Sequence, residues 1–371
     1  MNIKILRYID KYFFGFLILI FFVFKYLYIF RKNELVKNPK KILIIRLWAL
    51  GSSLLSFPMI KQLEEYYGKN VEFDLLATNR NISVFKNQEY FKNIYNIFNL
   101  KDFLNIILSF KKYDIIIDTE EYFKLSGLLS IWLGKIGIGF SNLKVRGLSY
   151  NLSVKYNGEQ HSILTSLDLI SKLGIKYKIP EKMEKLIYLD KDKLKVDNFL
   201  KNYNGKKIIC IHAGGAETSA ERFWSNKNWI NLIQKILANN SDTIILLSGT
   251  KFEEESISEI SNSFQNNKNL INICGNFNLF EFAYLLEKVN LMISNDTGPM
   301  HLSASMGTKT IGLFGPNLPS RFGAYPLNKN INLYKGDGTA YINVHLGKFE
   351  KCSKDIINRI SVDDVYKNIT L

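Results

Sequence analysis

Short apolar runs alternate with longer amphipathic stretches from about residue 41 to the end of the chain. The runs have the length and composition of buried strands, and the stretches between them repeat their apolar residues at helical spacing. In the first half the apolar runs are KILIIRL, VEFDLLAT, NIYNIF, DIIIDTEEYF and KIGIGF. Strands that alternate with helices form parallel, doubly wound sheets, which bind ligands at the carboxyl ends of their strands. The pattern therefore predicts an α/β protein.

The clearest example of this pattern is LMISNDTGPMHLSASMGTKTIGLFGP, from Leu291 to Pro316. It predicts a buried strand from Leu291 to Ser294, a polar turn, a helix that opens at Pro299, and a second strand from Thr310 to Phe314. A proline at the start of a helix costs no hydrogen bond.

The polar turn before this helix holds residues that suit an anion. Asp296 or Thr297 can cap the helix, and Gly298 lets the backbone approach a ligand closely. The exposed N–H groups of a helix start, together with the positive end of the helix dipole, bind phosphate. His301 in the first turn can reach a phosphate oxygen or a sugar hydroxyl. A capped turn without a ligand is the alternative that the motif leaves open.

The segment 13–30, FFGFLILIFFVFKYLYIF, is apolar except for Lys25. As a helix it would be about 27 Å long, close to the thickness of a bilayer core. We therefore expect a membrane anchor, with an interfacial amphipathic helix or a helix docked on the protein as the alternatives. More basic residues follow the segment than precede it, which places the main body on the cytoplasmic face of the inner membrane.

Lysine and arginine number 49 against 34 aspartates and glutamates, a formal net charge of +15. The lysines are scattered instead of forming one arginine-rich stripe, so we expect no nucleic-acid partner. Attraction to an anionic membrane surface and to phosphorylated ligands fits this charge better. The three cysteines lie far apart and the four histidines are not closely paired, which predicts neither a disulfide framework nor a metal site.

With 371 residues the chain suits two domains and an appendage. We expect a membrane-associated helix at 1–40, a first Rossmann-like domain at 41–180, a second at 206–350 and a terminal helix at 351–371. The stretch 181–205 is rich in Lys, Asp and Glu and is predicted to be the linker.

Three residues in the second half are further candidates for ligand binding. Gly214 follows the apolar run KIICIHA and allows close approach of a diphosphate. Arg222 has the planar fork of donors that suits phosphate, although it can instead pair with Glu221 or Glu217. Glu253 follows the turn SGT and can accept hydrogen bonds from a ribose, but acids at a helix start also occur for the helix dipole alone.

The run NDTGPMHLSASMG, followed by a strand and LFGP, resembles the donor-site signature of the family-nine glycosyltransferases, the heptosyltransferase type. The similarity extends from about Lys41 to the C-terminus, through IIR-x-x-x-LG, YDIIID, GIGF and RFWS-x-x-x-W. It places Arg222 at the donor phosphates and makes the end of the chain similar to the family's terminal helix. In the same segment we expect Trp224 and Trp229 to be packing residues.

The resemblance implies the GT-B fold, with two Rossmann-like doubly wound domains facing a cleft, to which this chain adds an N-terminal apolar helix. The second domain would bind a nucleotide-diphospho-sugar as a substrate, with no cofactor, and ADP-heptose is the family's usual donor. The first domain would bind a lipopolysaccharide or another lipid-linked cell-envelope glycan as acceptor. Transfer would invert the anomeric centre and would need no metal.

The chain departs from the family at one position of chemical importance. Family members are thought to carry a catalytic aspartate directly after the LG pair, where this chain has Ser52. A serine hydroxyl is too weak a base to replace a carboxylate, so we expect Ser52 to cap the helix. Glu120 or Glu121, after the run DIIIDT, is the predicted replacement base, with a solvated acidic loop as the alternative.

Two other functions stay open at this point. One is a membrane-tethered relative that binds a nucleotide-sugar without catalysis, because its base was lost at Ser52. The other is a nucleotide-sugar epimerase on the same architecture, against which the apolar N-terminal stretch argues.

Overall fold

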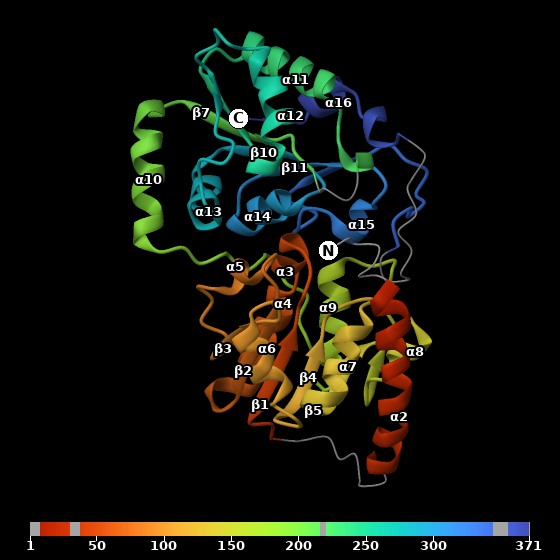
Figure 1. Cartoon of the computed structure of the whole chain (residues 1–371). Coiled ribbons are helices and arrows are strands. Elements are labelled where there is room, and N and C mark those ends of the chain that lie inside the picture. The colour runs from red at the N-terminus through yellow and green to blue at the C-terminus, as the bar shows by residue number, and fades with distance from the viewer. Residues whose placement is uncertain (1–7, 30–37, 216–219, 344–354, 371) are drawn as a thin grey trace. The chain divides into compact units, whose positions relative to one another are not determined.

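The computed structural model describes residues 8–29, 38–215, 220–343 and 355–370 (Figure 1). The chain divides into two compact units, one running to Ile179 and the other beginning at Pro180. Each unit contains one six-stranded sheet in which every neighbouring pair is parallel. The prediction of two Rossmann-like α/β domains is therefore confirmed.

The sheet of the first unit has the order β3-β2-β1-β4-β5-β6. Its central strands are the most apolar, and all four residues from Ile42 to Ile45 have no exposed surface. From β1 the chain adds strands toward one edge of the sheet, and from β4 it adds them toward the other edge. Such a reversal of strand order creates a crevice at the carboxyl ends of β1 and β4. The strands are β1 Lys41–Ile45, β2 Glu72–Ala77, β3 Asn93–Asn96, β4 Tyr113–Asp118, β5 Gly134–Phe140 and β6 Leu152–Val154.

Helices cover both faces of this sheet (Figure 1). The predicted break near Pro58 is present, since one helix ends at Leu55 and the next begins at Phe57 with the proline in its first turn. The helices are η1 Asp10–Phe14, α2 Gly15–Ile29, α3 Leu50–Leu55, α4 Phe57–Tyr67, η2 Gly68–Asn70, α5 Ile82–Phe85, α6 Leu100–Ile107, α7 Lys124–Leu133, α8 Lys144–Gly147 and α9 Ser162–Ser171.

The sheet of the second unit repeats the same order within its own numbering, β12-β11-β10-β7-β8-β9. Its reversal point lies between β7 and β10. The strands are β7 Lys207–His212, β8 Thr243–Ser248, β9 Leu270–Asn272, β10 Leu291–Asn295, β11 Thr310–Phe314 and β12 Ile331–Tyr334. The helices are α10 Asp190–Leu200, η3 Lys201–Tyr203, η4 Ala220–Arg222, α11 Asn226–Asn239, η5 Lys251–Glu253, α12 Glu254–Asn262, α13 Leu279–Lys288, α14 Gly298–Met306, α15 Pro319–Phe322, η7 Ile357–Arg359 and α16 Val362–Tyr366.

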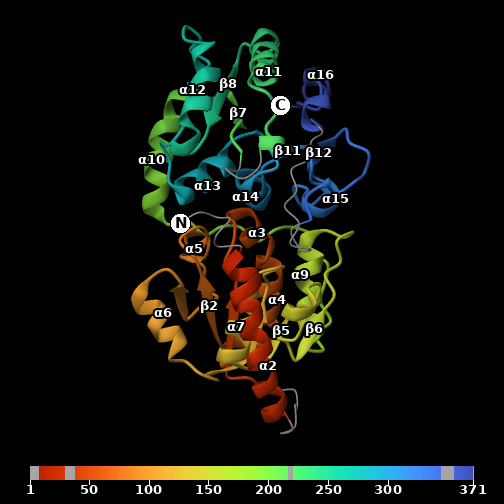
Figure 2. The same ribbon diagram turned by 45° about the vertical axis from the view of Figure 1, so that its right-hand side comes forward.

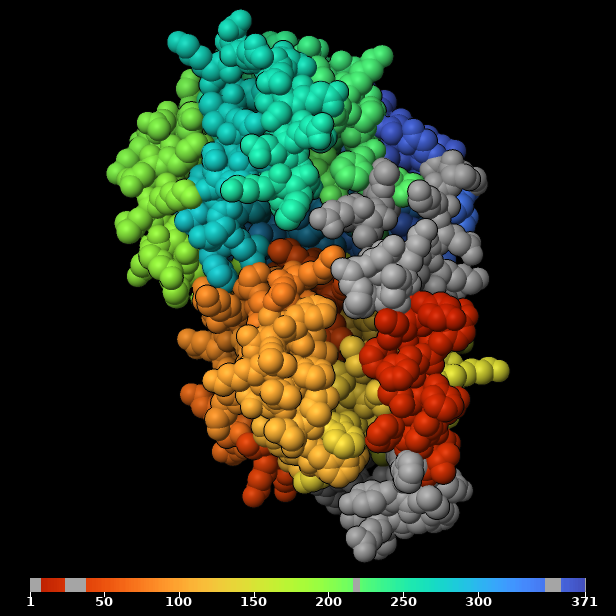
Figure 3. Space-filling view, in the orientation of Figure 1, coloured from red at the N-terminus to blue at the C-terminus, as the bar shows by residue number. Residues whose placement is uncertain are grey.

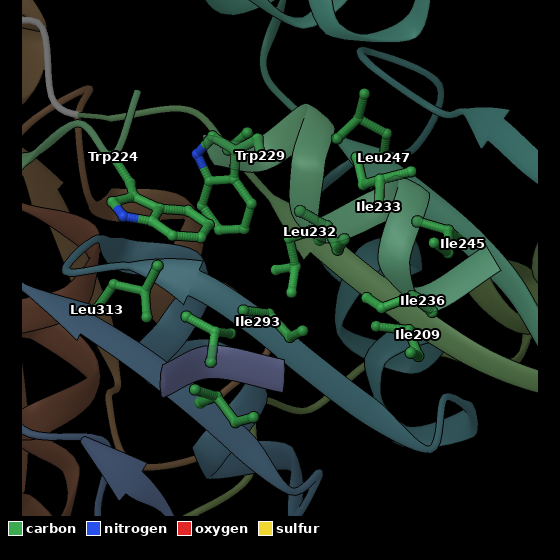
Figure 4. Packing of buried hydrophobic residues seen from close by; sticks show 14 of the residues in the cluster. Ile209, Trp224, Trp229, Leu232, Ile233, Ile236, Ile245, Leu247, Ile293 and Leu313 are labelled. Atoms are coloured by element: carbon green, nitrogen blue, oxygen red, sulfur yellow. The ribbon is translucent and has the colours of Figure 1, made fainter. Parts of the chain in front are cut away.

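Two tryptophans fill the core of the second unit above β10 and β11 (Figure 4). The rings of Trp224 and Trp229 meet edge to face at 4.9 Å, and each residue is at most 1% exposed. They pack with Ile293 and Leu313 from the two strands. The prediction that both are packing residues is confirmed.

The segment predicted to be a linker, 181–205, contains α10 and belongs to the second unit. This helix packs on α13, where Asp197 accepts a 2.8 Å hydrogen bond from Tyr284. The described part of the C-terminal segment joins the same unit, because Ile357 and Val365 are fully buried in its core. Within this segment the helical turns are short, η7 and α16.

The N-terminal helix α2 lies along α7 on the first unit (Figure 2). Asp10 begins this docking, since its Oδ1 accepts 3.0 Å hydrogen bonds from the backbone N–H groups of Lys124 and Leu125 at the start of α7. One face of α2 is buried, with Ile18 fully enclosed and the ring of Phe21 6.0 Å from that of Trp132. Within the described ranges, no helix combines the length and apolarity needed to cross a membrane.

We expect Asp10→Ala to lower the free energy of unfolding of the first unit by about 1 kcal/mol, because α7 would lose the carboxylate that caps its first N–H groups. Denaturant unfolding, together with protease resistance of residues 8–29, measures this. The matched control is Asp190→Ala in the first turn of α10, where the carboxylate is 95% exposed and little change is expected. Equal effects of the two substitutions would contradict the docking role.

Candidate functional site

The reversal point of the second unit brings the ends of β7 and β10 side by side, with Ser294 opposite His212. Asn295, the last residue of β10, ties the two following loops together. Its Nδ2 donates to the carbonyl oxygens of Ala213 at 3.1 Å and Gly214 at 2.9 Å. The side chain is fully buried, so it fixes the glycine loop next to the start of α14.

Helix α14 begins without a side-chain cap, so the prediction that Asp296 or Thr297 caps it is wrong. The Thr297 hydroxyl donates back to the carbonyl of Asn295 at 3.2 Å, and the Asp296 carboxylate accepts from Nδ2 of Asn317 at 2.5 Å. Both side chains are thus turned toward the ends of strands. Because no side chain of the described residues takes their place as cap, the first N–H groups of α14, from Gly298 onward, suit an anionic ligand.

Arg222 lies beside this helix start, with its Nη1 3.7 Å from Oδ2 of Asp296. Its side chain is 22% exposed, and its Nε has no hydrogen-bond partner among the described residues. The buried carboxylate of Asp296 therefore holds a guanidinium that retains free donors. The alternative pairing with Glu217 involves a residue outside the described ranges.

Glu253 is the last residue of η5, the short helix that follows β8. Its Oε2 accepts hydrogen bonds from the backbone N–H and the hydroxyl of Thr250, at 2.7 and 2.8 Å. Its other oxygen lies 3.7 Å from Nε2 of His212, whose pKa is lowered because burial disfavours the charged ring. A Cβ placed on Gly214 would come within 2.1 Å of Oε1 of Glu253, so a side chain at this position would have to displace that carboxylate.

The structure thus brings together the predicted residues of the second half. Gly214 lies against Glu253, Arg222 pairs with Asp296, and Thr297, Gly298 and the buried His301 follow at the start of α14. Sequence reasoning did not select three buried polar residues that complete this site. They are His212 and Asn295, which end their strands, and Asn317, three residues after the end of β11, and these positions were the available signal.

In the first unit the ends of β1 and β4 are held together by Glu120. Its Oε1 accepts the backbone N–H groups of Leu47 at 2.7 Å and Trp48 at 3.2 Å. Its Oε2 accepts no hydrogen bond from the part of the chain that the structure describes. Burial raises the pKa of Glu120 to about 7, although the charge of Arg46 and the Leu47 N–H oppose the rise.

The backbone of Glu120 is fixed by a second, fully buried carboxylate. Oδ1 of Asp118 accepts the N–H of Glu120 at 2.9 Å, and Oδ2 accepts from Arg146 at 2.9 Å and from Tyr150 at 2.5 Å. The Asp118–Arg146 pair is fully enclosed. Asp118 therefore positions the loop that carries Glu120, whereas Glu121 is only partly buried.

The prediction that Ser52 caps its helix is wrong. Helix α3 starts at Leu50, so its N-cap position belongs to Ala49, which makes no side-chain cap. Ser52 is the third helical residue. Its neighbour Ser53 donates its hydroxyl to the Ala49 carbonyl at 2.8 Å. The helix begins earlier than a cap at Ser52 would require.

Two Rossmann-like units in one chain, each with polar groups gathered at its reversal point, are the domain composition of the GT-B class. The family model described as "Glycosyltransferase family 9 (heptosyltransferase)" matches residues 106–353, and the chain belongs to this family. The predicted family and the enzyme class are therefore confirmed.

Relatives agree with this assignment. The chain is 27% identical over 350 residues to lipopolysaccharide heptosyltransferase 1 of Campylobacter coli, covering 88% of this chain and 97% of that protein. It is 24% identical to the lipopolysaccharide core heptosyltransferase OpsX of Haemophilus influenzae, covering 80% and 85%. The solved structure of E. coli ADP-heptose lps heptosyltransferase II has the same fold, with a TM-score of 0.69, 17% identity and coverage of 88% and 96%.

Substitution of Glu120 by glutamine should stabilise the protein at high pH. Because the folded pKa is raised above that of the unfolded chain, the folded state holds a proton that the unfolded state has already lost. This cost to stability is absent below about pH 4, grows as the pH rises, and reaches at most about 3 kcal/mol above pH 7. Denaturant unfolding should thus show a higher free energy of unfolding for Glu120→Gln than for the wild type at about pH 8, and little difference at about pH 4. A gain of equal size at both would contradict the raised pKa.

Gly214→Ala should weaken the affinity for a nucleotide-diphospho-sugar about tenfold, because the added methyl group displaces the Glu253 carboxylate from Thr250. Calorimetric titration measures the affinity. Glu254→Ala, at the exposed residue next to Glu253, is the control and should bind as the wild type does. Unchanged binding by Gly214→Ala would remove this loop from the donor site.

Proposed function

We propose that this protein transfers a heptose-like sugar from a nucleotide-diphospho-sugar of the ADP-heptose kind to a lipopolysaccharide core or another cell-envelope glycan. Membership of the family and the activities named for its relatives support the donor and acceptor classes. The observation that carries the proposal is the uncapped start of α14 with the guanidinium of Arg222 beside it. This arrangement suits a diphosphate, which has charge on several oxygens.

The donor would bind the second unit. Its diphosphate would accept hydrogen bonds from the N–H groups at Gly298 and from Arg222, with the hydroxyl of Thr297 and the ring of His301 at the sugar side. The chain at Gly214 has no side chain to obstruct the nucleotide, and Glu253 would bind the ribose. As the sugar leaves, charge grows on the diphosphate, and preorganised donors stabilise it without a metal.

The acceptor would bind the first unit, with Glu120 as general base. The acceptor oxygen forms a bond to the anomeric carbon while the bond from that carbon to the diphosphate oxygen breaks. The proton of the acceptor hydroxyl passes to Oε2 of Glu120. Attack from the face opposite the departing diphosphate inverts the anomeric centre. A base with a pKa of about 7 is well matched to neutral pH.

The protein would act at the cytoplasmic face of the inner membrane, where a lipid-linked acceptor is presented. Support comes from the net charge of +15 and from the apolar N-terminal segment.

A panel of nucleotide-diphospho-sugars tests the donor by thermal shift, since a ligand that binds only the folded state raises its stability. ADP-heptose should raise the melting temperature, and Arg222→Ala should weaken its binding about tenfold to a hundredfold. Addition of a lipopolysaccharide core acceptor should then yield glycosylated product and free ADP by mass spectrometry, also in the presence of a chelator. Binding without turnover on every acceptor would overturn transfer, and conversion of donor without acceptor would indicate an epimerase.

Glu120→Gln should lower kcat by about 10²–10⁴-fold while donor affinity stays the same, because only the proton acceptor is lost. In the wild type, kcat should rise with pH through about 7, since the carboxylate must be ionised to act as base. Glu121→Gln is the matched control and should retain turnover. If Glu121→Gln abolishes turnover and Glu120→Gln does not, the assignment of the base is wrong.

A further inference from the structure

The exposed large apolar side chains of this protein are concentrated on two parts of the first unit. Of twenty such residues in the described ranges, seven lie between Tyr8 and Val23 and six between Phe98 and Phe110. The remaining seven are spread over both units, so the concentration on these two segments is a specific feature.

On α2 and the turn before it, the exposed residues form one face of a helix. Tyr12, Phe16, Leu19 and Val23 are spaced by four, three and four positions and are 45–61% exposed. The opposite face, which includes Ile18, is buried against α7. Docking therefore leaves an outward apolar face that no described part of the protein covers.

The second segment is continuous with the first through Trp132 on α7. Its ring lies 6.0 Å from that of Phe21 on α2 and 4.7 Å from that of Phe110, and its Nε1 donates to the carbonyl of Ile107 on α6. Figure 3 shows α2 in red and the orange segment that includes α6 on the same face of the first unit. Leu108, just after α6, is 81% exposed.

Exposed lysines lie on the same two segments as the apolar side chains. Lys11, Lys101 and Lys112 are exposed along the two segments. The two carboxylates there are engaged by backbone N–H groups, Asp10 at the start of α7 and Asp102 with the N–H of Asn96 at 2.9 Å. An apolar face with a lysine border matches an anionic bilayer, because the apolar residues reach the acyl boundary and lysines meet the headgroups.

We propose that the outward faces of α2 and α6 form an in-plane binding surface for an anionic lipid bilayer. The helix α2 lies in the interface with one face on α7 and the other in the lipid. An interface with a second copy of the chain fits less well, since lysine is depleted at protein interfaces and a lipid surface needs no complementary shape. The inference rests on the proposed function only in that a lipid-linked acceptor is presented at this surface.

Flotation of the full-length protein with vesicles tests the surface. Binding should be strong to vesicles of phosphatidylglycerol and phosphatidylethanolamine, weak to phosphatidylcholine alone, and should fall as salt is raised. The pairs Phe16→Ser/Val23→Ser on α2 and Leu104→Ser/Leu108→Ser on the α6 segment should each lower the partition coefficient at least about tenfold. The matched control pair is Ile187→Ser/Leu194→Ser, on exposed apolar residues of the second unit, which should bind as the wild type does.

Each other outcome overturns a stated part of the proposal. Equal binding to anionic and neutral vesicles would show that charge does not contribute to binding. Unchanged binding of the Leu104→Ser/Leu108→Ser variant would show that α6 is not part of the surface. Absence of vesicle binding, with self-association in analytical ultracentrifugation that Phe16→Ser/Val23→Ser abolishes, makes the face an interface between copies. Two independent pairs keep the test valid if one lowers the melting temperature. No sugar is present, so failure here leaves donor binding and turnover as separate results.

Discussion

The pairing of the first strand with the fourth in each sheet is the constraint on which the rest of the structure depends. Successive strands run outward in opposite directions from this pair, so the loops that follow it diverge and leave backbone groups without sheet partners. The first unit satisfies two such N–H groups with the carboxylate of Glu120. The second satisfies two carbonyl oxygens with the amide of Asn295. The same geometric problem thus receives opposite chemical solutions.

These solutions give the two units different electrostatic character. A carboxylate enclosed at the end of β4 gains a raised pKa, because burial disfavours its charged form. A neutral amide at the end of β10 adds no charge, and the start of α14 and the guanidinium of Arg222 lie there beside the carboxylate of Asp296. The negative charge of Asp296 offsets part of the positive charge of Arg222, and its carboxylate holds the guanidinium in place. The proposed general base thus lies on one unit and the proposed anion site on the other.

The N-terminal helix α2 adds an exposed apolar face to the first unit. One apolar face of α2 is buried against α7, and the other apolar face stays exposed. The unit assigned to the acceptor is then the one with the apolar, lysine-bordered face. A lipid-linked acceptor and its membrane would meet the enzyme on the same unit.

The sequence by itself determined the two parallel sheets, the family, the packing role of Trp224 and Trp229, and the position of the candidate residues after strand ends. Hydrophobic periodicity reports which face of an element is buried, and that information is local. The hydrogen-bond partners of the buried polar side chains were decided only by the tertiary structure. Glu120 meets the N–H of Leu47 across 73 residues, and Asp10 caps a helix 114 residues away. The expected caps were wrong for different reasons. The helix at Ser52 begins two residues earlier, the Thr297 hydroxyl donates to the nearby carbonyl of Asn295, and only Asp296 is drawn away by a partner that the folded sheet brings within reach, Asn317, 21 residues along the chain.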